Sequence, residues 1–236
     1  MRDWLRRRLR PDPYDEKADP AQLAAAGRSV AAHLAANPQA EALGGRKADM
    51  FLVRDFLSGA QCDALIAAIE SEIRPSTLFS SEGPAGGRTS STHYFADGSA
   101  ATATLAARLD AVMGIPRSHG ETIQGQRYRQ GEEYRHHCDF FRVEREHWQR
   151  ERRRGGQRTW SAMIYLNDVP GGGETDFPTL GFAVKPERGT LLTWNNMDRS
   201  GRPNRATRHA GMPVTDGVKY VVTQWYRIEE WSLRQR

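Results

Sequence analysis

The sequence predicts a mainly β domain of α+β character, an antiparallel sandwich or barrel of jelly-roll type preceded by supporting helices. From Glu121 onward, short runs rich in β-branched and aromatic residues alternate with turns rich in glycine and proline, and no helical pattern separates them. Before Glu121, apolar residues recur at the three- and four-residue spacing of helices. The 236 residues suffice for one large all-β domain.

Most strands are expected in the C-terminal half of the chain, where clear turn signals separate them. Glycine and proline cluster at Val169–Gly173, Pro186–Gly189 and Asp216–Gly217. The expected strands there are Glu121–Arg129, Tyr134–Arg142, Thr159–Asn167, Phe182–Lys185, Thr190–Asn195, Arg208–Pro213 and Lys219–Ile228. Two earlier strands are expected at Met50–Phe56 and Thr92–Phe95.

Three helices are expected in the N-terminal half. Asp19 is a suitable N-cap for the first, and a proline occupies its first helical position. The second begins after Ser58, which forms a capping-box pattern with Gln61, and Pro75 would end it. The third is expected over Ala100–Met113.

The N-terminal half also suggests a division into segments. Residues 38–48 are interpreted as a linker, so that 1–48 form an N-terminal helical extension and 49–236 form the main domain. Residues 76–98 are rich in serine, glycine and threonine and are expected to form a mobile loop.

The composition excludes one class of protein and suggests a compartment. No apolar run is long enough to span a membrane, which excludes an integral membrane protein. The positively charged start is not followed by an apolar stretch, so a signal peptide is not expected. Cys62 and Cys138 are too few for a disulfide framework. We therefore expect a cytoplasmic protein; the sequence does not indicate its oligomeric state.

The positive charge of the chain is concentrated in two segments. The net charge is +5, and arginines cluster in residues 142–158 and 199–208, both in expected loops. A solvated basic surface is one interpretation, and a site for an anionic substrate or acidic partner is another. A nucleic-acid partner is less favoured, because the interleaved aromatic and basic pattern of a single-strand channel is not evident.

A candidate metal site begins in the stretch Tyr128–Phe141, YRQGEEYRHHCDFF. His137 and Asp139 are two residues apart, so on an extended chain they point to the same side and can converge on one cation. The same rule directs His136 and Cys138 away. A second histidine would complete the two-histidine, one-carboxylate face of non-haem Fe(II) oxygenases.

The C-terminal block offers both a third ligand and an anion-binding residue. Of the seven histidines, His209 stands at the start of an expected strand. Lys219 opens the apolar strand KYVVTQWYRI, and a lysine there either reaches solvent or pairs with an anion. At a metal site that takes a dicarboxylate, Lys219 would meet the carboxylate far from the metal.

Seven motifs occur in succession between residues 50 and 228. They are Tyr128-x-x-Gly131-x-x-Tyr134-x-x-His137-x-Asp139-Phe140-Phe141, Gly155–Arg158, Tyr165–Val169, Gly172–Pro178, Lys185-Pro186-x-x-Gly189, His209–Val214 and Gly217-x-Lys219-x-x-x-x-x-Trp225. In order and spacing they resemble the motifs of prolyl 4-hydroxylase-type Fe(II)/2-oxoglutarate dioxygenases.

This resemblance implies a double-stranded β-helix, the cupin-like form of the jelly roll, and a set of site residues. The iron ligands that it implies are His137, Asp139 and His209. The residues that it places in the 2-oxoglutarate pocket are Lys219, Tyr128, Thr175 and Trp225. Lys219 is the residue expected to pair with the C5 carboxylate of 2-oxoglutarate.

The resemblance also implies an activity. Fe(II) and 2-oxoglutarate, with ascorbate as an additional cofactor, would support hydroxylation of an unactivated C–H bond, most plausibly on a peptidyl, prolyl-type side chain, with release of succinate and CO2. A free amino acid or small metabolite is the alternative substrate, and a nucleic-acid-directed oxygenase or a catalytically silent metal-binding sandwich are further alternatives.

Two arginines are candidate substrate-binding residues. Arg158 matches an arginine that helps to hold the substrate in peptidyl members of the family. Arg227 stands where those members often carry a histidine that contacts the peptide, so it is a departure from the pattern that adds positive charge.

Overall fold

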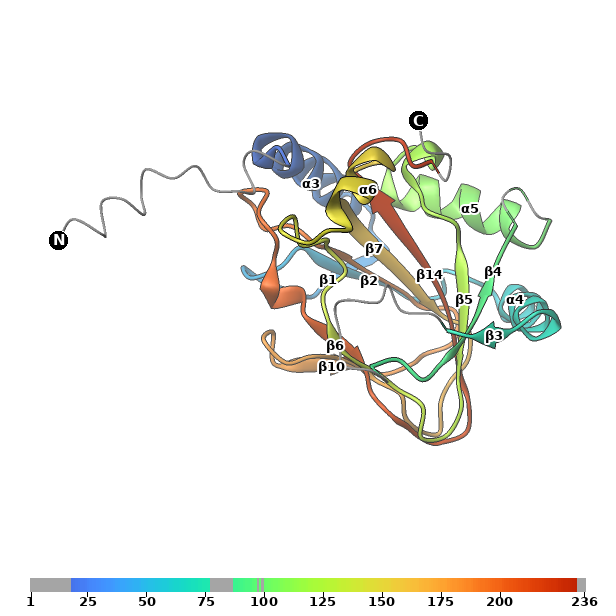
Figure 1. Cartoon of the computed structure of the whole chain (residues 1–236). Coiled ribbons are helices and arrows are strands. Elements are labelled where there is room, and N and C mark those ends of the chain that lie inside the picture. Colours follow the sequence, from blue (N-terminus) through green and yellow to red (C-terminus); the bar gives the residue numbers. More distant parts are fainter. Residues whose placement is uncertain (1–17, 77–86, 97, 99, 233–236) are drawn as a thin grey trace.

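Two antiparallel β-sheets face each other, and helices cover the outer face of the larger one (Figure 1). The structure is a computed structural model and describes residues 18–76, 87–96, 98 and 100–232. Facing antiparallel sheets are the jelly-roll arrangement that the sequence predicts. No helix among these described residues is long and apolar enough to cross a membrane.

The larger sheet has eight strands, and every pairing in it is antiparallel. In spatial order they are β1 (Ala40–Ala42), β2 (Met50–Val53), β11 (Leu191–Asn195), β7 (Arg158–Tyr165), β14 (Lys219–Arg227), β5 (Gln124–Tyr128), β4 (Ser91–Tyr94) and β3 (Arg74–Pro75). The central strands β7 and β14 are buried along almost their whole length.

The smaller sheet has four strands and lies on the opposite side of the core from the helices (Figure 1). Its order is β10 (Phe182–Val184), β9 (Thr175–Phe177), β12 (His209–Gly211) and β6 (Tyr134–His137). A further pair joins β8 (Gly171–Gly172) to β13 (Val214–Asp216).

Three helices form where the sequence predicts them: α3 (Pro20–Ala35), α4 (Gly59–Ser71) and α5 (Ala100–Met113). The Asp19 carboxylate caps α3 by accepting hydrogen bonds from two backbone N–H groups of its first turn. Ser58 and Gln61 form the predicted capping box of α4. Short helices also occur at η1 (Arg117–His119), α6 (Trp148–Arg153) and η2 (Arg205–Thr207).

Side chains on the two faces of β14 have different surroundings: one face packs against the helices, and the other faces a cavity. Val222 and Tyr226 pack with residues of the three long helices in one apolar cluster. Lys219, Val221 and Thr223 point the other way and line a cavity between the sheets. Because successive side chains of a strand face opposite sides, one strand both anchors the helices and builds the cavity.

Several expectations at the level of single elements are wrong. The expected linker contains β1, which pairs with β2, and α3 packs into the main core, so residues 18–48 belong to the same packed body as the larger sheet. The helix α4 ends at Ser71, and Pro75 lies in the edge strand β3, where a missing N–H is tolerated. The strands β8, β9 and β13 have two or three residues each, too few to show a period in the sequence.

Two expectations lie partly or wholly outside the described residues. The polar, arginine-bearing start of the chain falls in residues 1–17, and part of the loop expected over 76–98 falls in 77–86.

The contact between α4 and β5 gives a testable prediction. A Cβ atom at Gly125 would lie 2.3 Å from Cγ1 of Ile69, so the strand and the helix leave no room for a methyl group. We expect Gly125→Ala to lower the free energy of unfolding by about 1–3 kcal/mol. In an Ile69→Ala background, the same change should cost much less, because the clashing atoms are gone. Urea unfolding of the double-mutant cycle measures this coupling, and strictly additive effects would contradict it.

Candidate metal centre and its cavity

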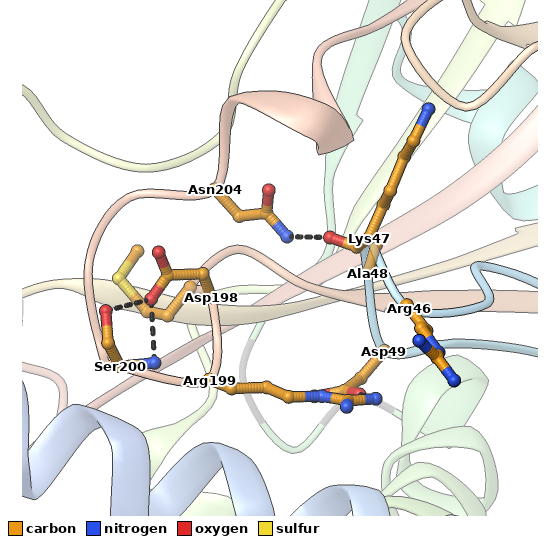
Figure 2. Close-up of a pocket in the computed structure, with 9 residues that line it drawn as sticks. Arg46, Lys47, Ala48, Asp49, Asp198, Arg199, Ser200 and Asn204 are labelled. Atoms are coloured by element: carbon orange, nitrogen blue, oxygen red, sulfur yellow. Dashed lines mark hydrogen bonds and ion pairs between the residues drawn. The ribbon is translucent and has the colours of Figure 1, made fainter.

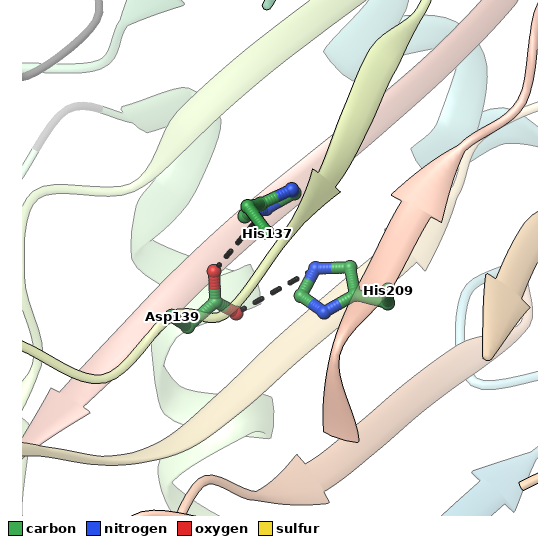
Figure 3. Close-up of side chains that lie close together, drawn as sticks. All are labelled: His137, Asp139 and His209. Carbon is green, nitrogen blue, oxygen red and sulfur yellow. Dashed lines mark ion pairs between the residues drawn. The ribbon is translucent and has the colours of Figure 1, made fainter. Parts of the chain in front are cut away.

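Three side chains from separate parts of the chain converge between the sheets. The ligand atoms of His137, Asp139 and His209 all lie within 4.8 Å of one another. Nε2 of His137 is 3.5 Å from one carboxylate oxygen of Asp139, and Nε2 of His209 is 3.9 Å from the other. Figure 3 shows the carboxylate facing both rings. The structure thus brings together the three residues that the sequence singled out.

The pairing of two strands creates this convergence. His137 ends β6 and His209 begins β12, and the two residues are direct partners in the antiparallel register. Asp139 lies just beyond the end of β6, where the chain bends. His136 faces the other way, and its Nε2 is 2.7 Å from a carboxylate oxygen of Asp176. The prediction that His136 and His137 point to opposite sides of the strand therefore agrees with the structure.

Backbone carbonyl groups orient both rings. The Nδ1 atom of His137 lies 2.8 Å from the carbonyl oxygen of Arg135, and Nδ1 of His209 lies 3.0 Å from that of Thr207. A carbonyl can only accept, so Nδ1 carries the proton in each ring and the lone pair of Nε2 faces the centre. Metal-binding histidines are typically held in this way.

The carboxylate of Asp139 is held in a buried polar network. Ser161 donates a hydrogen bond of 2.6 Å to it, and Asn196 donates to the Ser161 hydroxyl at 3.0 Å. Burial by itself would raise the pKa of Asp139, but His209, His137 and the nearby positive charge outweigh burial and hold that pKa well below its usual range. Asp139 is therefore an anion at neutral pH, as a metal ligand must be.

The histidine ligands lie among aromatic rings. The ring of Tyr134 stacks on His137 with centroids 3.6 Å apart, and Trp194 meets His209 edge-on at 4.8 Å. Burial, together with the neighbouring His137, lowers the pKa of His209 to about 4. The His209 imidazole is thus neutral at physiological pH and able to donate its lone pair. Two imidazoles and one carboxylate are the donor set that suits Fe(II).

A buried cation lies in the same cavity. Lys219 is 2% exposed, and its ammonium group has one described partner, the carbonyl oxygen of Gly173 at 2.6 Å. The rings of Tyr128 and Tyr165 flank it, at 5.3 and 5.5 Å from their centroids. Burial lowers the pKa of Lys219 to about 7, an effect that the charge of Glu174 partly opposes. A buried ammonium with unused donors fits an anionic ligand.

The metal centre and the lysine line one hollow, which we call the central cavity. Its volume is about 460 Å³ when the solvent at its mouth is included. The seven expected residues that line it are His137, Asp139, His209, Lys219, Tyr128, Thr175 and Trp225. The structure adds Arg88, Gln126, Tyr134, Met163, Trp194, Gly211, Val221 and Thr223.

The two expected substrate-binding arginines do not line the central cavity. Arg227 is 3% exposed and donates to Glu121, Glu151 and the carbonyl oxygen of Gly156. Its donors are taken by buried groups, which corrects the expectation that it contacts substrate. Arg158 forms a bidentate pair with Glu121, and its guanidinium lies 4.1 Å from the ring centroid of Trp225. Arg158 therefore supports the indole of a cavity residue from outside the lining, and its charge also acts on Asp139.

Sequence reasoning missed several residues that support the site. The Tyr165 hydroxyl lies 2.6 Å from that of Thr175, a residue that lines the cavity. Ser161 is fully buried in β7. The only sign of it in the sequence is a serine within a run that is expected to form a strand. Asn196 comes directly after β11, and only the folded chain reveals its contact with Ser161.

Comparisons with known proteins agree with this geometry. The model of the 2OG-Fe(II) oxygenase superfamily matches residues 123–227. "Probable prolyl 4-hydroxylase 9" of Arabidopsis thaliana is 31% identical over 75% of this chain and 67% of its own length. "Probable prolyl 4-hydroxylase 3" of the same plant is 30% identical over 78% of this chain and 70% of its own.

A solved structure shares the fold. The viral collagen prolyl hydroxylase of Paramecium bursaria Chlorella virus-1, in complex with 2-oxoglutarate, superimposes with a TM-score of 0.60 at 28% identity and covers 79% of this chain and 99% of its own. The facing sheets described above are thus the double-stranded β-helix of such enzymes. Because the plant relatives align along two thirds or more of their length, the chain belongs to the prolyl 4-hydroxylase-like 2-oxoglutarate- and Fe(II)-dependent dioxygenases.

Proposed function

We propose that this dioxygenase hydroxylates prolyl side chains of a peptide or protein, with conversion of 2-oxoglutarate to succinate and CO2. One observation carries the proposal: a two-histidine, one-carboxylate centre and a buried lysine line the same cavity. The plant relatives named prolyl 4-hydroxylases and the viral collagen prolyl hydroxylase support the prolyl substrate.

We assign the metal to His137, Asp139 and His209. When bound there, Fe(II) supplies the dioxygen chemistry that couples oxidation of 2-oxoglutarate to hydroxylation of a C–H bond. The protein contributes position and environment. The carbonyl groups of Arg135 and Thr207 orient the two rings, and Ser161 orients the carboxylate, so these contacts would hold the ligands in place for the metal.

We assign the far end of the cavity to 2-oxoglutarate. The Lys219 ammonium would pair with its C5 carboxylate, and the hydroxyls of Thr175 and Tyr128, which line the same cavity, would serve as donors for its oxygens. Such hydrogen bonds to a charged group are the stronger kind, and the apolar walls reduce competition from water. Binding energy at this end would orient the keto acid toward the metal.

The substrate would approach past Trp225. Arg158 holds this indole from behind by a cation–π contact, and Glu121 fixes Arg158. Arg227 completes the buried network through the same Glu121. In this proposal the two arginines act as positioning residues for the wall of the site and do not themselves bind substrate.

A free amino acid or small metabolite is the second candidate substrate. The partly enclosed central cavity favours it, because small-molecule sites are concave and mostly apolar. We also propose ascorbate as an accessory reductant, by analogy with the family, and a cytoplasmic location, which the unpaired thiols of Cys62 and Cys138 support.

Substitutions should separate the metal ligands from the cosubstrate anchor. His137→Ala and His209→Ala should each remove stoichiometric Fe(II) binding and succinate formation, because two ligands hold the ion poorly. Lys219→Ala should keep the metal and raise the KM for 2-oxoglutarate about 10- to 100-fold, the cost of losing a charge-assisted contact. Metal analysis and succinate assays measure both effects.

Lys185→Ala is the matched control for the lysine. Lys185 is exposed and does not line the central cavity, so its variant should retain the wild-type KM. An unchanged KM for 2-oxoglutarate in the Lys219→Ala protein would contradict the proposal that Lys219 binds the C5 carboxylate of 2-oxoglutarate.

The affinity for 2-oxoglutarate should depend on pH through Lys219. Its pKa of about 7 in the free protein means that the ammonium form dominates below pH 7 and the neutral amine above it. A bound carboxylate favours the ammonium form, so binding above pH 7 must take up a proton. The dissociation constant should therefore rise with pH above 7, by at most about tenfold per unit.

Calorimetry on the Mn(II)-loaded protein tests this dependence. The apparent enthalpy at pH 8 should vary with the ionisation enthalpy of the buffer, because a proton is taken up, and this variation should fade at pH 6. A dissociation constant that is flat from pH 6 to 9 would contradict a titrating lysine at the site.

Peptide turnover tests the proposed function itself. The iron-loaded protein should form succinate and add one oxygen atom to a proline in at least one member of a library of proline-containing peptides, as read by mass spectrometry. Oxidation of free amino acids without any oxidation of peptides would favour the second candidate.

A further inference from the structure

A groove opens next to the metal centre. His137 lines both this groove and the central cavity, so the two hollows meet at a metal ligand. Cys138, which stands between the ligands His137 and Asp139, also lines the groove. We call this hollow the arginine groove, after the three guanidinium groups that border it: those of Arg142, Arg205 and Arg208.

The three arginines carry uncompensated charge. Each is exposed, and among the described residues none of their side chains forms an ion pair or a hydrogen bond. All three line the same hollow together with Cys138. Glu144 is the single carboxylate in the lining. The groove therefore carries an excess of positive charge beside the reacting centre.

The arginine groove is more positive than another hollow of the molecule. A second hollow lies between residues 46–49 and 197–204, and Figure 2 shows its lining. There Arg199 lies 3.6 Å from Asp49, and Asp198 supplies a further carboxylate that binds Ser200. In that hollow three cationic side chains, those of Arg46, Lys47 and Arg199, face two carboxylates, whereas in the arginine groove three guanidinium groups face one carboxylate.

The floor of the groove is apolar. Phe140, Phe141 and Val143 line it and are each less than 8% exposed. The two phenylalanine rings are buried in the protein and offer no exposed face on which a nucleic-acid base could stack. A cationic rim over an apolar floor instead suits a peptide whose acidic side chains meet the arginines while its main chain crosses the floor.

We propose that the arginine groove binds acidic side chains of the substrate, so that the enzyme selects prolines flanked by aspartate or glutamate. This inference rests on the proposed function and specifies its substrate class. Because the groove adjoins His137, the selected carboxylates lie within a few residues of the hydroxylated proline. Exposed guanidinium–carboxylate contacts contribute modestly one by one, but several acting together discriminate between peptides.

A set of matched peptides tests the selection. Each peptide has one central proline and differs only within three positions on either side, which carry glutamate, glutamine or lysine. For the iron-loaded, full-length protein, the KM should be lowest for the glutamate peptide, roughly tenfold below that of the glutamine peptide, and highest for the lysine peptide. The advantage of glutamate should shrink as salt is added, because exposed charges are screened.

Charge reversal makes the test specific to the groove. In the double variant Arg142→Glu, Arg208→Glu, the preference should invert, so that the lysine peptide has the lower KM. The control variant Arg28→Glu, Arg46→Glu changes net charge equally at exposed positions outside the groove and should retain the glutamate preference. An inversion in both variants, or in neither, would overturn the assignment to the groove.

The outcomes separate this inference from the function on which it rests. If no peptide of any charge is hydroxylated, the proposed function fails. If all three peptides are hydroxylated with equal KM, the function stands and the acidic preference is wrong. Fluorescence anisotropy adds a readout that does not need turnover: a labelled glutamate peptide should bind more tightly than a single-stranded oligonucleotide of equal charge, and the reverse order would overturn the choice of partner.

Discussion

The site depends on one cross-strand pair. His137 and His209 are partners in the antiparallel pairing of β6 and β12, with ring centroids 4.3 Å apart. A slip of one residue would turn one histidine to the opposite face and dismantle the centre. The register is held from the other side as well, because β12 also pairs with β9, where Asp176 accepts the hydrogen bond of His136. The histidine that does not bind metal thus helps to hold in place the one that does.

The strand β14 links this centre to the rest of the molecule. One face of the strand packs against the helices, and the other carries Lys219 into the central cavity. A buried lysine is unfavourable for folding, and the lowered pKa of Lys219 is the sign of that cost. The proposed pairing with a carboxylate of 2-oxoglutarate would explain its position. The surrounding helices and sheets supply the rigid frame in which such a residue is tolerated.

The sequence predicts the ligands and the helices better than it predicts the supports of the site. The period of two explains why His137 and Asp139 share a side, and the capping residues Asp19 and Ser58 mark helices that form as expected. Contacts such as Asn196 with Ser161 join distant segments and leave no local signal. The surroundings of Arg227 also leave no local signal. Its charge can be read from the sequence, but its pairing with the buried carboxylates of Glu121 and Glu151 is known only from the structure.

The central claim is that the histidine–carboxylate centre and Lys219 form a single site for Fe(II) and 2-oxoglutarate. Anaerobic titration of the Fe(II)-loaded protein with 2-oxoglutarate tests this most directly, since a keto acid chelated to Fe(II) produces a visible charge-transfer absorption. We predict that the absorption appears and saturates at one equivalent, and that Lys219→Ala shifts saturation to much higher 2-oxoglutarate concentrations. Stoichiometric Fe(II) binding without any such absorption would contradict the account.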